Sequence, residues 1–209
     1  MRLGRPAGGP LVLRGAAMLT VNPDVSVVES QLESDELVCP SCSGVLAGWG
    51  WATERTIGRA WAARRVRPRR SRCRGCKATH VLLPTLMLLR RGDAVEVIGR
   101  VLGLGGAGWS RRRIARELGL PRTTVRGWLD RFATRAEQVR AHLTRWALAL
   151  DPGLSRIEPT GSAVGDAVAA MVAAAEAAGA SSAWRFVSAA TGGRLLCNTS
   201  SPFPAPWVA

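Results

Sequence analysis

The chain has few acidic residues, a single lysine and no long apolar run. Its 29 basic residues are all arginine except Lys77, and only 15 acidic residues oppose them. The longest apolar candidate, Ala163 to Ala178, contains Asp166 and Glu176, so it cannot serve as a membrane span. The apolar run near the N-terminus is interrupted by Arg14 and is too short for a secretory signal. The composition therefore predicts a cytoplasmic protein.

The shortage of acidic residues is concentrated in the middle of the chain. From Arg55 to Gly92 there are twelve basic residues and no acidic one, and from Trp109 to Arg140 nine basic residues face three acidic ones. From Trp146 onwards three basic residues face four acidic ones. This distribution indicates a surface that lies along a polyanion. The hydrophobic fraction of 47% is enough for one or two small domains.

Four of the five cysteines form two CxxC pairs that are separated by thirty residues. These cysteines are Cys39, Cys42, Cys73 and Cys76. Two such pairs can surround a structural Zn²⁺ with four thiolates and leave no open position for chemistry. Strand-like patterns at Trp49 to Ile57, Trp61 to Val66 and Thr79 to Leu83 complete the outline of a zinc ribbon. The alternatives are two disulfides, which a cytoplasmic protein disfavours, and a redox pair, which no thioredoxin-like pattern supports.

Two further residues carry chemistry that the ribbon does not require. His80 follows Cys76 by four positions, but four cysteines already fill a zinc shell, and the surrounding THVLLP is typical of a buried strand. Cys197 has no neighbouring cysteine, and although it could pair with His142 as a nucleophile, a buried or free thiol is the simpler interpretation. We therefore assign no catalytic residue.

The stretch from Arg111 to Phe132 has the pattern of two short helices that cross at a tight turn. Ile114 and Leu118 share one face of the first helix, and Gly119 suits the left-handed conformation that ends it. Pro121 suits the first turn of the second helix, where its missing N–H has no partner to lose. The expected inward face of the second helix comprises Val125, Trp128 and Leu129. Its expected outward face comprises Arg122, Thr123, Thr124 and Arg126.

This pattern resembles the helix-turn-helix family of DNA-binding motifs, of the resolvase and transposase type. The residues that carry the resemblance are Ala115, Gly119, Val125 and Trp128. In that family the second helix enters the major groove, which assigns Arg122, Thr123 and Arg126 to base edges and Thr124 to a phosphate or the helix start. The alternative is an ordinary helical hairpin with a solvated basic face. The expected DNA contacts are Arg111, Arg112, Arg113, Arg122, Thr123, Thr124 and Arg126 in the motif and Arg67, Arg69 and Arg70 in the ribbon.

A third helix is expected between the ribbon and the motif. Asp93 can cap it. Its expected inward residues are Ala94, Val97, Ile98, Val101 and Leu102. The glycine-rich LGLGGAG that follows is expected to form a loop, and without a preceding strand it is not a nucleotide cradle.

Apolar residues then recur at alternating spacings of four and three, which predicts one long helix with a heptad seam. The seam comprises Phe132, Ala136, Val139, Leu143, Trp146 and Leu150. It spans under three heptads and ends at Asp151, which favours packing within the chain over a coiled-coil dimer. Ser162 can cap a partner helix that ends at Gly179, and Trp184 to Ala190 predicts another short helix. The expected inward residues of the partner helix are Val164, Val168, Met171, Val172 and Ala175.

The expected fold is mainly α with a small β zinc ribbon. Residues 1–35 form a poorly defined N-terminal segment whose start is Met1 or Met18, and residues 36–84 form the ribbon. Residues 90–131 form the helix-turn-helix domain, 132–195 a helical region and 196–209 an irregular tail. A ribbon with WG and RRSRCRGC elements before a helix-turn-helix is similar to the N-terminal DNA-binding region of insertion-sequence transposases. It is also similar to stand-alone proteins of GC-rich, actinobacterial-type bacteria.

We expect a sequence-specific double-stranded DNA-binding protein without enzymatic activity, either a transcriptional regulator or a transposon-associated accessory factor at the nucleoid. A transposase or integrase needs three carboxylates that hold Mg²⁺ on a long mixed sheet. The alanine-rich C-terminal region offers only Asp151, Glu158, Asp166 and Glu176. The alternatives are a transposase or integrase, a truncated fragment of one, and a protein-interaction adaptor. The DNA target and the oligomeric state stay open, so a homodimer or a recombinase partner is compatible with the sequence.

Overall fold

The structure, a computed structural model, describes residues 19–58, 63–197 and 203. The choice between Met1 and Met18, the start of the strand expected at Trp61 and most of the 196–209 tail lie outside these residues. The strands are β1 (Leu19–Val21), β2 (Leu46–Trp51), β3 (Arg55–Ile57), β4 (Arg64–Val66), β5 (Arg69–Cys73) and β6 (Thr79–Pro84). The helices are α1 (Val25–Glu33), α2 (Val95–Gly106), α3 (Arg111–Glu117), α4 (Arg122–Ala133), α5 (Ala136–Leu150), α6 (Ala163–Ala177) and α7 (Ala183–Ala190).

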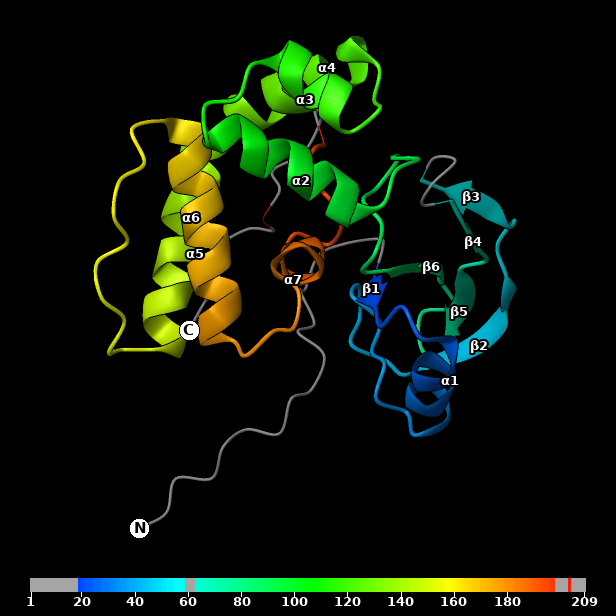
Figure 1. The fold of residues 1–209 in the computed structure, drawn as a ribbon. Coiled ribbons are helices and arrows are strands. Elements are labelled where there is room, and N and C mark those ends of the chain that lie inside the picture. Colours follow the sequence, from blue (N-terminus) through cyan, green and yellow to red (C-terminus); the bar gives the residue numbers. More distant parts are fainter. Residues whose placement is uncertain (1–18, 59–62, 198–202, 204–209) are drawn as a thin grey trace.

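Figure 1 shows a strand-rich part, built from β1 to β6 with α1, beside a helical part that contains α2 to α7. A mainly helical fold with a small β part is therefore confirmed. The larger sheet has the order β1-β6-β5-β2, in which β1 runs parallel to β6 and the other pairs are antiparallel. Strands β3 and β4 form a separate antiparallel pair. None of the helices that the structure describes has the length and apolarity that crossing a membrane requires.

Helix α1 and strand β1 belong to the same core as strands β2 and β6, so from here the ribbon means the strand-rich part between residues 19 and 84. Val28 and Leu32 of α1 are buried in one cluster with Leu46 of β2 and Leu82 of β6. Asp24 caps this helix, because its carboxylate accepts a hydrogen bond of 2.9 Å from the Ser26 amide. Residues 19–33 carry no convincing pattern in the sequence, since a three-residue strand and a nine-residue helix are too short to show a period.

Helices α2, α3 and α4 form the three-helix unit that the sequence predicts. Gly119 lies between α3 and α4 with a φ of 59°, in the left-handed region, as its position at a helix end requires. Leu120 is buried beneath this turn, and Val125 and Trp128 bury one side of α4. The hydrophobic contacts on both sides of the turn therefore fix the angle between α3 and α4.

The prediction that LGLGGAG forms a loop is wrong, because Gly103 to Gly106 continue α2. These glycines allow close packing instead of a turn. A Cβ atom on Gly105 would clash with Leu129, and one on Gly106 would lie 2.9 Å from the Cα atom of Gly165 in α6. The expected cap at Asp93 is also wrong, since the helix begins one residue later and its N-cap residue, Ala94, has no side-chain cap.

The single long helix expected from Phe132 is interrupted, because α4 ends at Ala133 and α5 begins at Ala136. Helices α5 and α6 then pack side by side within the chain (Figure 1). Ser162 caps α6 as expected, since its hydroxyl accepts a hydrogen bond from the Gly165 amide.

The inward face of α6 includes Met171 and Ala175 as expected, together with a glycine and three alanines that the sequence does not single out. Its buried residues are Gly165, Ala167, Ala170, Met171, Ala174 and Ala175. Val172 is exposed, as is Leu150 at the end of the expected seam. The small alanine side chains allow the helices to approach closely, and Val164 and Val168 pack against the same core while partly buried.

Helix α7 joins the helical part to the ribbon. The Ser188 hydroxyl is buried and donates a hydrogen bond of 2.8 Å to the Met87 carbonyl, just after β6. The Leu89 amide donates to the Gly193 carbonyl at 2.8 Å. Because these bonds connect residues far apart in sequence, they fix the ribbon beside the three-helix unit.

Candidate metal centre and nucleic-acid interface

Cys39, Cys42, Cys73 and Cys76 bring their four sulfur atoms within 4.8 Å of one another. The Cys39 and Cys76 sulfurs are 3.7 Å apart, the Cys42 and Cys73 sulfurs are 3.4 Å apart, and all four are free thiols. A tetrahedron with Zn–S bonds of about 2.3 Å has sulfur–sulfur edges of about 3.8 Å. The thiols therefore fit a four-coordinate zinc ion, and the alternative of two disulfides does not describe this structure.

Two matching turns carry the thiols. After each CxxC pair one residue adopts the left-handed conformation, Ser43 with φ 59° and Lys77 with φ 63°. The Ser43 amide donates to the Cys39 carbonyl at 2.9 Å, and the Lys77 amide donates to the Cys73 carbonyl at 3.2 Å. Each turn thus buries its first cysteine and exposes its second. The sequence does not reveal the two left-handed positions, because neither residue is glycine.

Gly44 packs directly against the thiols. A Cβ atom at this position would lie 3.1 Å from the Cys73 sulfur and 3.3 Å from the Cys42 sulfur, so a side chain would crowd the centre. The Ser41 amide donates a hydrogen bond of 3.4 Å to the Cys39 sulfur. Backbone groups therefore shape this site as much as the cysteine spacing does.

The two exposed thiols differ in acidity. The Gly44 backbone amide, together with the neighbouring thiols, lowers the pKa of Cys42 to about 6. The Ala78 amide lowers the pKa of Cys76, but hydrogen bonds from the other thiols and desolvation outweigh it and raise that pKa to about 11. The cluster thus holds one readily formed thiolate, and a divalent cation would favour deprotonation of the others.

His80 lies beside the thiol cluster. Its side chain is buried, and its Nε2 atom is 3.4 Å from the Cys39 sulfur. The four-cysteine group does not include it. A buried imidazole in this place can orient a thiolate that holds a metal ion. The sequence shows the proximity of His80 to Cys76 but does not show that it approaches Cys39 across the sheet.

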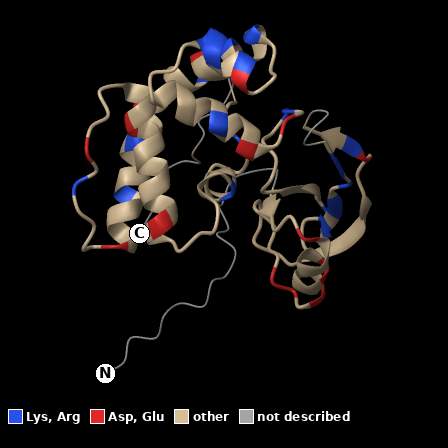
Figure 2. Ribbon diagram, in the orientation of Figure 1, with Lys and Arg blue, Asp and Glu red and all other residues tan. Residues whose placement is uncertain are grey.

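The helix-turn-helix exposes one side of α4 and buries the other. Arg122, Thr123 and Arg126 are exposed and Thr124 is half-buried, whereas Val125 and Trp128 face the core. Figure 2 shows basic residues along α3 and α4 and on the ribbon strands, whereas acidic residues gather around α1. The outward face of α4 is therefore positive and fixed by a rigid core.

The three arginines at the start of α3 have different surroundings. Arg111 forms an ion pair of 2.5 Å with Asp130 of α4, and the Arg113 guanidinium stacks 3.6 Å from the centre of the Trp109 ring. Arg112 is exposed. Arg111 and Arg113 thus support the motif itself, and of the three arginines Arg112 has the side chain most free to contact a ligand.

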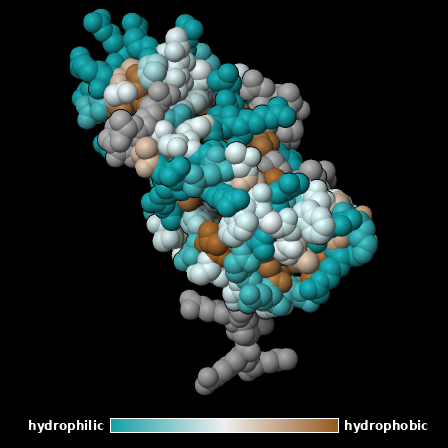
Figure 3. All heavy atoms as spheres, turned by 90° about the vertical axis from the view of Figure 1, so that its right-hand side faces the viewer, coloured by the Kyte–Doolittle hydropathy of each residue, from teal (hydrophilic) through white to brown (hydrophobic). Residues whose placement is uncertain are grey.

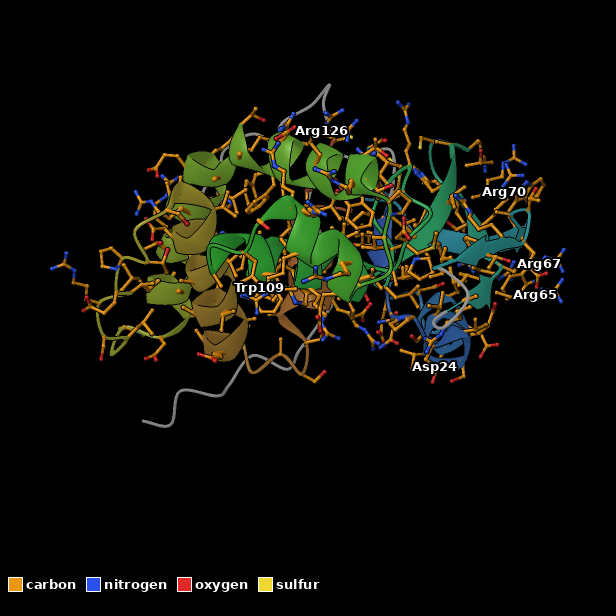
Figure 4. All side chains as sticks on the ribbon, turned by 45° about the horizontal axis from the view of Figure 1, so that its top comes forward. Asp24, Arg65, Arg67, Arg70, Trp109 and Arg126 are labelled. Carbon is orange, nitrogen blue, oxygen red and sulfur yellow. The ribbon has the colours of Figure 1, made fainter. Side chains whose placement is uncertain are left out.

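The three ribbon arginines that are predicted to contact DNA also differ in exposure and in their contacts. The Arg69 side chain is only 17% exposed, because it forms an ion pair of 2.6 Å with Glu29 and also hydrogen-bonds the Gly50 carbonyl. Arg67 is exposed, and Arg70 is half-buried with an Nε atom that has no hydrogen-bond partner among the described residues. In Figure 4, Arg65, Arg67 and Arg70 point away from the ribbon. Arg65 is a basic residue of this surface that the predicted contact set does not contain.

Residues 85–140 match the family model of a homeodomain-like domain. The match covers α2, α3, α4 and the start of α5, and it leaves out the ribbon and the C-terminal helices. The chain therefore contains a helix-turn-helix DNA-binding region of the homeodomain-like type. No curated protein and no solved structure matches the chain.

Proposed function

We propose that the protein binds double-stranded DNA sequence-specifically, as a transcriptional regulator or a transposon-associated accessory factor, and has no enzymatic activity of its own. The exposed face of α4 carries this proposal. Arg122 and Arg126 are four residues apart, so they project from the same side of the helix, and both are exposed. An arginine can donate two hydrogen bonds to one guanine in the major groove, and Thr123 beside them can bond either a base or a phosphate.

The ribbon has a different part in the proposed complex. The exposed Arg65 and Arg67 and the half-buried Arg70 project from strands and turns instead of from a helix that fits a groove. Contacts of this kind to phosphates position a protein on the duplex without reading its sequence. Zn²⁺ held by Cys39 and its three partner cysteines would supply the rigid link between the two turns. The ribbon then adds affinity, and α4 adds specificity.

Selection of bound fragments from random double-stranded DNA, at two salt concentrations, tests the proposal. We expect one enriched sequence motif at both concentrations, because base contacts survive salt that weakens phosphate contacts. A palindromic motif would indicate a dimer, since half-site symmetry mirrors protein symmetry. Recovery of unenriched fragments at both concentrations would contradict sequence-specific binding.

The proposed lack of enzymatic activity has its own test. Incubation of the protein with the enriched duplex and Mg²⁺ should leave both strands uncut, and strand cleavage or joining would favour a transposase instead. A recombinase gene beside this one in the genome would favour the accessory role over the regulatory role.

A further inference from the structure

Two tryptophans of β2 are exposed, although tryptophan is a side chain that folding usually buries. Trp49 is 52% exposed and Trp51 is 38% exposed, and they are the exposed large aromatic side chains among the residues that the structure describes. Strand β2 is the last strand of its sheet, so none of the strands that the structure describes pairs with its outer edge. The exposed fractions of the two rings show that another molecule can reach each of them beside this strand.

Arginine side chains lie over both rings. The Arg72 guanidinium is 4.7 Å from the centre of the Trp49 ring, and those of Arg69 and Arg67 are 4.9 Å and 6.0 Å from the centre of the Trp51 ring. Other contacts hold two of these arginines in place. Arg72 donates to the Lys77 carbonyl at 3.2 Å, and Arg69 is paired with Glu29. We call Trp49, Trp51, Arg67 and Arg72 the tryptophan–arginine strip.

The backbone of β2 gives the strip an open surface. The pairing of β2 with β5 is irregular between Gly48 and Trp51. Gly50 has a φ of 93°, and no atom of the described residues lies within 4 Å of the position of a Cβ. A bulge of this kind redirects the side chains of a strand. Figure 3 views the molecule from the ribbon side, where hydrophilic side chains surround separate patches of less polar ones.

The chemistry of the strip favours unpaired bases over a duplex backbone or a protein. Phosphate contacts require cations but no flat rings, and the bases of a duplex are already stacked on one another. An unpaired base offers a flat face that stacks on indole, and arginine beside it can bond the phosphate. A protein partner would need a wider apolar patch, whereas the segment from Arg55 to Gly92 has twelve basic residues and no acidic one.

We propose that the tryptophan–arginine strip binds single-stranded DNA, with unpaired bases stacked on Trp49 and Trp51 and with Arg67 and Arg72 at the phosphates. The inference rests on the DNA binding proposed above, and it adds a second mode of binding. Helix α4 reads the duplex, and the ribbon holds bases that have left a duplex.

Binding of a twelve-nucleotide thymidine strand to the zinc-loaded full-length protein tests this inference. An abasic strand with the same number of phosphates is the reference probe, because it keeps the charge and lacks the bases. We expect the Trp49→Ala variant to bind the thymidine strand about tenfold more weakly than the wild type. Its affinity for the abasic strand should not change. Trp49→Phe should keep most of the affinity, since its ring can still stack.

The control for the duplex site is Arg126→Ala, which should keep the affinity for the thymidine strand. Zinc content equal to that of the wild type shows that the ribbon of each Trp49 variant is folded. The inference is overturned if the wild type binds both strands equally, if Trp49→Ala weakens both equally, or if uridine strands bind more tightly than thymidine strands. If the duplex selection yields no enriched motif but binding of the thymidine strand still depends on Trp49, only the proposed duplex readout is overturned.

Discussion

Gly99 and Gly103 lie one turn apart in α2, but their surroundings differ. A Cβ atom on Gly99 would clash with the Trp184 ring of α7, whereas none of the described residues lies within 4 Å of the corresponding position at Gly103. We expect Gly99→Ala to lower the free energy of unfolding by about 1 to 3 kcal/mol, because Trp184 must shift. Gly103→Ala should raise it by up to about 1 kcal/mol, since alanine is the better helix former. Urea unfolding of both variants measures these free energies. A change of the same sign in both variants would contradict the described packing.

His142 makes the stability of the helical part depend on pH. Its ring stacks on Phe203 with centroids 3.8 Å apart, and desolvation, with a smaller contribution from Arg145, lowers the pKa of His142. A lowered pKa means that the unfolded chain binds the proton more tightly, so this contribution to stability is present above the ordinary pKa, about 6.5. It is lost as the pH falls through the lower pKa of the folded state.

We therefore expect the melting temperature of the wild type to fall more between pH 7.5 and pH 5 than that of His142→Gln. Glutamine does not titrate in this range, and the two proteins can be compared in the same buffers by thermal unfolding. Parallel pH curves for the two proteins would show that His142 keeps its ordinary pKa in the folded chain.

Among the elements, the ribbon and the helices have separate hydrophobic clusters. The ribbon cluster contains Cys39, Leu46 and Cys73, whereas the helical cluster begins at Leu88. We expect one zinc ion per chain, and we expect its removal by a chelator to unfold the ribbon while most of the helical circular dichroism remains. Structural zinc sites of this kind contribute on the order of 10 kcal/mol to folding.

Metal analysis of protein purified under reducing conditions measures the zinc content directly. Cys73→Ser should lose the metal, because its sulfur belongs to the cluster, and Cys197→Ser should retain it, because its sulfur does not. Wild-type protein without zinc would disprove the metal centre. Full retention of zinc by Cys73→Ser would disprove the ligand set.

The elements that the sequence predicts well are those whose cause is local. The turn at Gly119 and the cap at Ser162 depend on residues a few positions away, so their patterns are visible in the chain itself. The helical conformation of Gly103 to Gly106 depends on packing against Leu129 and Gly165, which are distant in sequence. It could therefore not be predicted from the local pattern. The role of Arg69 depends in the same way on Glu29 in a helix without a clear pattern.

Across the whole molecule, two of the positively charged surfaces bear on DNA binding, the outward face of α4 and the arginines of the ribbon (Figure 2). We expect Arg67→Ala to weaken binding to all duplexes alike. The slope of log affinity against log salt should become shallower by about 0.9 for each phosphate contact that is lost. Arg69→Ala should behave differently, because Arg69 is paired with Glu29. Its main effect should be a lower free energy of unfolding, with little change in the salt slope. Equal salt slopes for the wild type and Arg67→Ala would contradict the proposal that the ribbon contacts duplex phosphates.

The central claim is that α4 reads bases, and competition binding with the selected duplex and a scrambled duplex tests it most directly. We expect Arg126→Ala and Arg122→Ala each to cost about 1 to 3 kcal/mol on the selected duplex and much less on the scrambled one. Arg126→Lys should lose most of the same preference, because lysine keeps the charge but not the two-pronged contact. Equal losses on both duplexes for Arg122→Ala and Arg126→Ala would contradict the claim, and α4 would then be only another part of the basic surface.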